Sequence, residues 1–112
     1  MSERPDALLL DDIREAIRRI RTYVGEMAWE EFRNDLKTQD SVVRNLEIIG
    51  EASRKLSESA RSASTEIPWR SMAGMRDRLI HHYAGVNLDI VWQVVSVELD
   101  ELSRALDRLP PA

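Results

Sequence analysis

The chain has 112 residues, a formal net charge of −4 and no cysteine. Its length suits a single domain covering residues 1–112, and the lack of cysteine excludes disulfides and thiolate metal sites. The net negative charge argues against a protein that coats nucleic acid with its whole surface, but it does not exclude a local RNA site.

The N-terminal third is predicted to contain two helices. The opening segment MSERPD is polar and does not resemble a signal peptide, and no apolar stretch near it is long enough to span a bilayer, so we expect a cytoplasmic protein without a membrane anchor. The apolar residues that follow are three or four positions apart: Ile13, Ile17, Ile20, Val24 and Met27. This spacing predicts an amphipathic helix over residues 6–25, and a short helix over 29–36 should follow it.

A third helix is predicted to start after Thr38 or Gln39 and to run to about residue 60. Its apolar stripe consists of Val42, Leu46, Ile49, Ala52 and Leu56. Gly50 lies in the middle of this helix, where glycine costs about 1 kcal/mol relative to alanine. We interpret Gly50 as the place where another helix backbone approaches closely, rather than as a catalytic position.

The C-terminal half is predicted to contain a loop and two further helices. Residues 61–68 have loop composition, and a fourth helix should run from about residue 69 to near Gly85. Asn87 is the expected N-cap of a fifth helix, which Pro110 and Pro111 should end. The stripe of this last helix alternates steps of four and three: Leu88, Trp92, Val95, Leu99, Leu102, Leu106 and Leu109. No strand pattern appears, so the predicted fold is an all-α, up-and-down bundle of four or five helices.

The segment from Arg76 to Tyr83 contains both histidines of the chain. Arginine binds phosphate through a planar fork of donors, and histidine moves protons near neutral pH. On a continuous helix Arg76 and His81 would point about 140° apart. Two alternatives would bring them to one target: the helix loosens near His81, or the site takes residues from two chains.

This combination of side chains suits cleavage of a phosphodiester without a metal. The reaction needs a base, an acid and a cation for the charged phosphorane, and a two-fold dimer would supply two copies of Arg76 and His81 across one cleft. With RNA as the substrate, the products would be a 2′,3′-cyclic phosphate and a 5′-hydroxyl. The alternative is that these residues are solvated or ion-paired, with Asp77 as a partner for an arginine. Adjacent histidines without a nearby third ligand are a weak metal signal, and no metal is assigned.

The spacing Arg76-x₄-His81-x-Tyr83 resembles the RxxxxHxY motif of HepT-like toxins in the HEPN superfamily. Residues 40–52, with their Gly-Glu-Ala ending, resemble the central helix of that family. Residues 67–69 and 74–75 resemble the approach to the motif, and residues 87–92 resemble the segment after it. The chain departs from the family at Asp77, where asparagine is frequent. Three alternatives follow for a carboxylate there: it pairs with Arg76 and competes with phosphate, it points to solvent, or it helps to orient a histidine.

The resemblance implies a HEPN-like homodimer that acts as a metal-independent endoribonuclease toxin on RNA, with tRNA as a candidate, and without a cofactor. Arg76 and His81 would be catalytic. Tyr83 would accept AMP from a minimal nucleotidyltransferase antitoxin, which would neutralise the toxin. Arg78 and His82 are assigned only a supporting role in RNA binding. The alternative function is a non-catalytic helical partner, or substrate-presenting subunit, of a nucleotidyltransferase.

Overall fold

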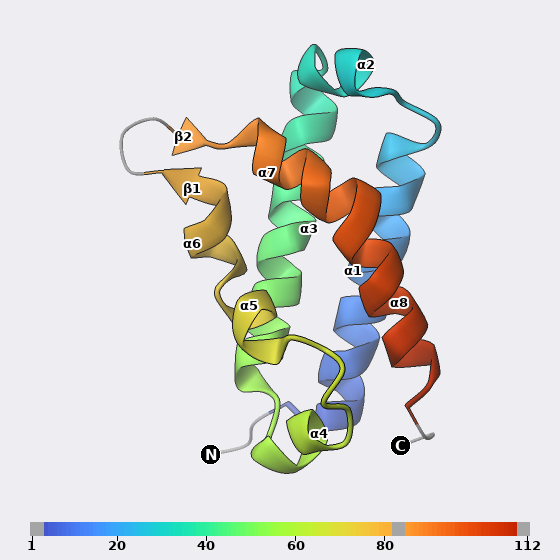
Figure 1. Cartoon of the computed structure of the whole chain (residues 1–112), viewed down its shortest axis with the longest axis vertical. Helices are drawn as coiled ribbons and strands as arrows, with labels where there is room; N and C mark the ends of the chain where they lie inside the picture. The colour runs from blue at the N-terminus through green and yellow to red at the C-terminus, as the bar shows by residue number, and fades with distance from the viewer. Residues whose placement is uncertain (1–3, 82–84, 110–112) are drawn as a thin grey trace.

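The computed structural model describes residues 4–81 and 85–109, apart from the side chain of His81. Two long helices, α1 (Asp6–Val24) and α3 (Leu36–Lys55), lie side by side, and shorter elements pack against them (Figure 1). A third arm of the bundle consists of α5 (Trp69–Ala73) and α6 (Met75–Leu79). A fourth arm consists of α7 (Leu88–Gln93), the π-helical segment η2 (Val94–Glu98) and α8 (Leu99–Asp107). The predicted all-α bundle is confirmed. Within the described ranges, no helix is long and apolar enough to cross a membrane.

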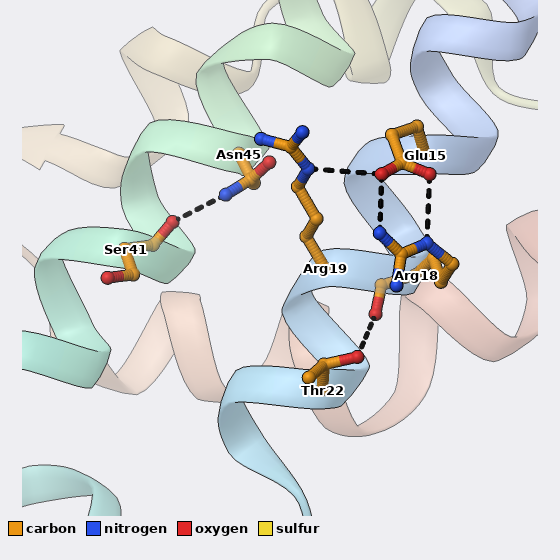
Figure 2. A network of polar contacts seen from close by, with 6 residues as sticks. All are labelled: Glu15, Arg18, Arg19, Thr22, Ser41 and Asn45. Carbon is orange, nitrogen blue, oxygen red and sulfur yellow. Dashed lines mark hydrogen bonds and ion pairs between the residues drawn. The ribbon is translucent and has the colours of Figure 1, made fainter.

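Helix α1 matches its predicted bounds to within one residue. The members of its predicted stripe from Ile13 to Val24 are buried, and Met27 is half-buried. The helix ends at Gly25, whose φ of 53° lies in the left-handed region that glycine adopts at little cost. Polar contacts cover the outer face, where the Glu15 carboxylate accepts hydrogen bonds from Arg18 Nε at 2.9 Å and Arg19 Nε at 3.1 Å (Figure 2).

The predicted bounds of the second and third helices are wrong because two side-chain caps were not anticipated. Helix α2 (Trp29–Arg33) stops short of residue 36, since the Asp35 side chain accepts a hydrogen bond from the Thr38 backbone N–H at 2.9 Å and so begins α3. At the other end, Leu56 leaves the helix and is buried in the core. Ser57 then caps the short helix α4 (Glu58–Ser62), which includes the first two residues of the predicted loop.

Gly50 is the contact point between α3 and the segment that carries the candidate site. A Cβ atom there would lie 3.1 Å from the Met72 carbonyl oxygen and 3.1 Å from the Met75 Cβ. These distances confirm the predicted close approach of another helix backbone. The approach holds α5 (Trp69–Ala73) and α6 (Met75–Leu79) against the middle of α3.

The predicted fourth helix is wrong beyond Leu79. The helical segment breaks once at Gly74, ends at Leu79, and continues as strand β1 (Ile80–His81), which pairs antiparallel with β2 (Gly85–Val86). The expectation of no strand is therefore also wrong. Gly85 has a φ of 77°, and the Asn87 backbone N–H donates to the Leu79 carbonyl oxygen at 2.7 Å. Glycine at the left-handed position and this long-range bond favour a hairpin over another helical turn.

The last arm comprises α7 (Leu88–Gln93), the π-helical segment η2 (Val94–Glu98) and α8 (Leu99–Asp107). Asn87 caps α7, as predicted, by accepting a hydrogen bond from the Ile90 backbone N–H at 3.2 Å. The predicted end at Pro110 and Pro111 lies outside the described residues.

The π-helical segment shifts the buried stripe of this arm. Val91 and Val94 are fully buried, whereas the predicted stripe members Leu88, Trp92 and Val95 are only partly buried, so the uninterrupted stripe is wrong in its first half. The next core residue after Val94 is Leu99, a step of five. A π turn is wider than an α turn, and it therefore lets Leu99 enter the core while Glu98 remains beside α6.

Candidate functional site

Arg76 lies on α6, in the arm that Gly50 holds against α3. Its side chain is exposed and lines a groove of about 420 Å³, to which α1, α3 and α5 also contribute. Within residues 4–81 and 85–109, Arg76 makes no ion pair. Its donors are therefore available to an anion that enters the groove.

The groove carries an excess of positive charge on a chain whose formal net charge is −4. The cations that line it are Arg4, Arg44, Arg54, Lys55 and Arg76. The anions are Asp12, Glu47 and Glu51. Five cations against three anions leave two positive charges. The sequence analysis did not identify Arg44, Glu47, Glu51 and Lys55 as one surface. Their spacing of three and four positions does indicate that they share one face of a helix.

Arg78 has a structural partner. Its guanidinium donates to both carboxylate oxygens of Glu98, at 2.9 Å and 2.7 Å, and both side chains are less than one-third exposed. The bond to Glu98 raises the pKa of Arg78 above its ordinary value. This bidentate pair joins α6 to η2, so the charge of Arg78 is largely neutralised within the fold. Its role in RNA binding stays a prediction, and the structure gives it a linking role.

His81 follows the end of α6, in β1, where its backbone pairs with that of Gly85. The separation of about 140° expected for a continuous helix therefore does not apply, because the chain leaves the helix after Leu79. Of the two alternatives for bringing Arg76 and His81 to one target, the loosened helix is present in this chain. The His81 side chain, His82 and Tyr83 lie outside the described residues, so their predicted roles stay predictions.

Asp77, the departure from the family motif, is exposed on α6. In the part of the chain that the structure describes, it forms no ion pair with Arg76. The same part contains no group of three histidines or carboxylates placed to hold a metal ion.

Comparisons with known proteins identify relatives over most of the chain. A family model described as ribonuclease HepT-like matches residues 13–109. "Probable ribonuclease HepT" of Thermococcus cleftensis is 44% identical over 100 residues, which cover 89% of this chain and 91% of the relative. "Putative RNase MJ1216" of Methanocaldococcus jannaschii is 37% identical over 109 residues, which cover 97% of this chain and 90% of the relative. No solved structure shows a significant match.

Proposed function

Because the chain belongs to the ribonuclease HepT-like family, we propose that it is a metal-independent endoribonuclease toxin that acts through Arg76 and His81. The observation that carries the proposal is the placement of Arg76 on an open groove with excess positive charge. A guanidinium with that exposure suits binding of a phosphodiester, since its fork matches two phosphate oxygens.

In the proposed reaction the ribose 2′-oxygen attacks the adjacent phosphorus. One imidazole takes the 2′-hydroxyl proton, and a second imidazolium donates a proton to the departing 5′-oxygen. Arg76 stabilises the negative charge of the phosphorane. The bond between phosphorus and the 5′-oxygen breaks, which leaves a 2′,3′-cyclic phosphate on one product and a 5′-hydroxyl on the other. Each proton that the base removes is matched by one that the acid supplies.

A homodimer would provide the two imidazoles. One chain carries a single His81 after α6, and its neighbour His82 lies outside the motif. A two-fold axis would place a second Arg76 and a second His81 across the same cleft. The proposed active unit is therefore a dimer with one composite site.

The proposed control of this activity is transfer of AMP to Tyr83 by a minimal nucleotidyltransferase that acts as the antitoxin. Tyr83 is two positions from His81. A nucleotide attached there would place a phosphate, which is anionic, beside Arg76 and His81. It would then compete with RNA for the cations and obstruct the cleft.

The proposed function is tested by incubating the purified chain with a total tRNA pool in EDTA, beside His81→Ala. Intact mass is measured first, so that a sample already carrying AMP on Tyr83 is not taken for an inactive one. We expect the unmodified wild type to cleave RNA and leave cyclic phosphate ends, and we expect the folded His81→Ala protein to leave the RNA intact.

The alternative function, a non-catalytic partner or substrate-presenting subunit of a nucleotidyltransferase, makes the opposite prediction. An unmodified, folded dimer would then cleave no RNA in any pool. Under this alternative, His81→Ala would still form the complex with the nucleotidyltransferase.

A further inference from the structure

The groove beside Arg76 continues along one face of α3. Arg44, Glu47, Glu51 and Lys55 follow one another at steps of three and four, which places them on one side of the helix, and all four line the groove. The span from residue 44 to residue 55 corresponds to roughly 16 Å of helix axis. The groove is therefore long for a single small anion and long enough for several phosphates of one strand.

Most of the charges in the groove are already engaged with one another. Arg4 donates to Asp12 at 2.7 Å and 2.9 Å, and Glu51 pairs with Arg54 and, at 3.7 Å, with Lys55. Arg44 is exposed and, within the described ranges, forms no ion pair. Arg44 and Arg76 are thus the two cations of the groove whose donors the described fold leaves available.

We propose that this groove binds the backbone of single-stranded RNA, with Arg44 on a phosphate next to the one that Arg76 holds. The proposal deepens the proposed function, on which it rests, and it adds Arg44 as a residue that supports RNA binding. Two arginines along one groove would recognise neighbouring phosphates without reading the bases.

Glu47 gives the proposal a second and opposite consequence. It is half-buried, lines the same groove, and makes no ion pair among the described residues. A carboxylate at that position repels a phosphate on the neighbouring Arg44. Loss of Arg44 should therefore weaken RNA binding, whereas neutralisation of Glu47 should strengthen it.

The test measures binding of a short, fluorescently labelled 2′-O-methyl RNA, which cannot form a cyclic phosphate. Arg44→Ala should weaken binding roughly tenfold, the effect of losing one charge-assisted contact. It should also lower the slope of log affinity against log salt by about 0.7, the loss of one phosphate contact on a single strand. Glu47→Gln should bind more tightly than the wild type. The matched control is Arg104→Ala, an exposed arginine on α8 that does not line the groove.

The proposal is overturned if Arg44→Ala binds RNA as the wild type does, or if Arg104→Ala loses as much affinity. The first result would be expected if the groove received an acidic protein segment instead. Because binding is measured without cleavage, the two proposals fail separately. If the chain binds RNA through Arg44 but cleaves none, the groove proposal stands and the ribonuclease proposal fails. If the chain cleaves RNA and Arg44→Ala binds RNA as the wild type does, the ribonuclease proposal stands and the groove proposal fails.

Discussion

Among the candidate site residues, Arg76 is one whose side-chain surroundings the structure describes. It is exposed on a groove rich in positive charge, and its neighbour Asp77 does not pair with it in the described ranges. The competition for Arg76 that Asp77 suggested is therefore not part of this structure. A phosphate that enters the groove would find the guanidinium of Arg76 without an ion pair among the described residues.

At the residue scale, Arg76→Lys tests whether geometry or charge matters. We expect RNA cleavage to slow by about tenfold to a thousandfold, because lysine keeps the charge but loses the planar pair of donors that stabilises the phosphorane. Affinity for 2′-O-methyl RNA should change by less than about threefold. Initial cleavage rates and binding curves measure the two effects.

The control for this prediction is Arg104→Lys, which should cleave at the wild-type rate. A wild-type rate for Arg76→Lys would mean that Arg76 acts only as a point charge.

At the element scale, η2 and the hairpin determine where the candidate site lies. The π turn leaves Glu98 beside α6, and Glu98 holds Arg78 two residues after Arg76. The bond from Asn87 to Leu79 closes the hairpin that carries His81. Both attachments, at Arg78 and at Leu79, therefore lie between the two catalytic candidates Arg76 and His81.

Glu98→Gln should destabilise the fold by about 1–2 kcal/mol, because it removes a bidentate, partly buried ion pair and leaves the Arg78 charge without its partner. RNA cleavage should fall as well, since α6 loses its attachment to η2. Urea denaturation measures the stability.

A double-mutant cycle tests the link between the two side chains. Glu98→Leu combined with Arg78→Met should recover most of the stability lost in Glu98→Leu alone. Strictly additive effects of the two substitutions would contradict a direct pairing.

The elements divide into those that local signals specify and those that distant contacts decide. Helix α1 and the Asn87 cap were predicted correctly because they depend on residues three or four positions apart. The caps at Asp35 and Ser57 carried sequence signals that were overlooked. The hairpin at Ile80 depends on backbone pairing with residues that follow later in the chain. The shift of the buried stripe at Leu99 depends on packing against other arms of the bundle.

At the scale of the whole molecule, exposed carboxylates held by arginines make stability depend on pH. Bonds from Arg18 and Arg19 lower the pKa of Glu15 from 4.5 to about 2. The pKa of Glu51 is lowered by Arg54 and that of Glu66 by Arg108. Groups with a lowered pKa in the folded state contribute stability above their unfolded pKa, and this contribution is lost as the pH falls through the folded value.

The urea midpoint should therefore stay level from pH 7 to about pH 5.5 and fall as the pH drops from 4.5 towards 2. The fall should be smaller in 0.5 M NaCl, because salt screens exposed pairs. Circular dichroism at 222 nm follows the transition.

Glu15→Gln should reduce the loss of stability on acidification, since glutamine does not titrate. A midpoint that rises on acidification, or a Glu15→Gln protein with an unchanged pH profile, would contradict the assignment.

The sequence by itself determined the helical class, the first helix and the Asn87 cap, because each depends on residues a few positions apart within one segment. It also predicted Arg76, His81 and Tyr83 as motif residues, and their roles stay predictions. Only the tertiary structure decided that Arg78 faces Glu98, that the chain leaves the helix before His81, and that Arg44 shares a groove with Arg76. The physical reason is how far apart in the sequence the interacting residues lie. Helix periodicity depends on neighbours within one or two turns, whereas an ion pair between arms or a groove between helices exists only once the core has brought distant residues together.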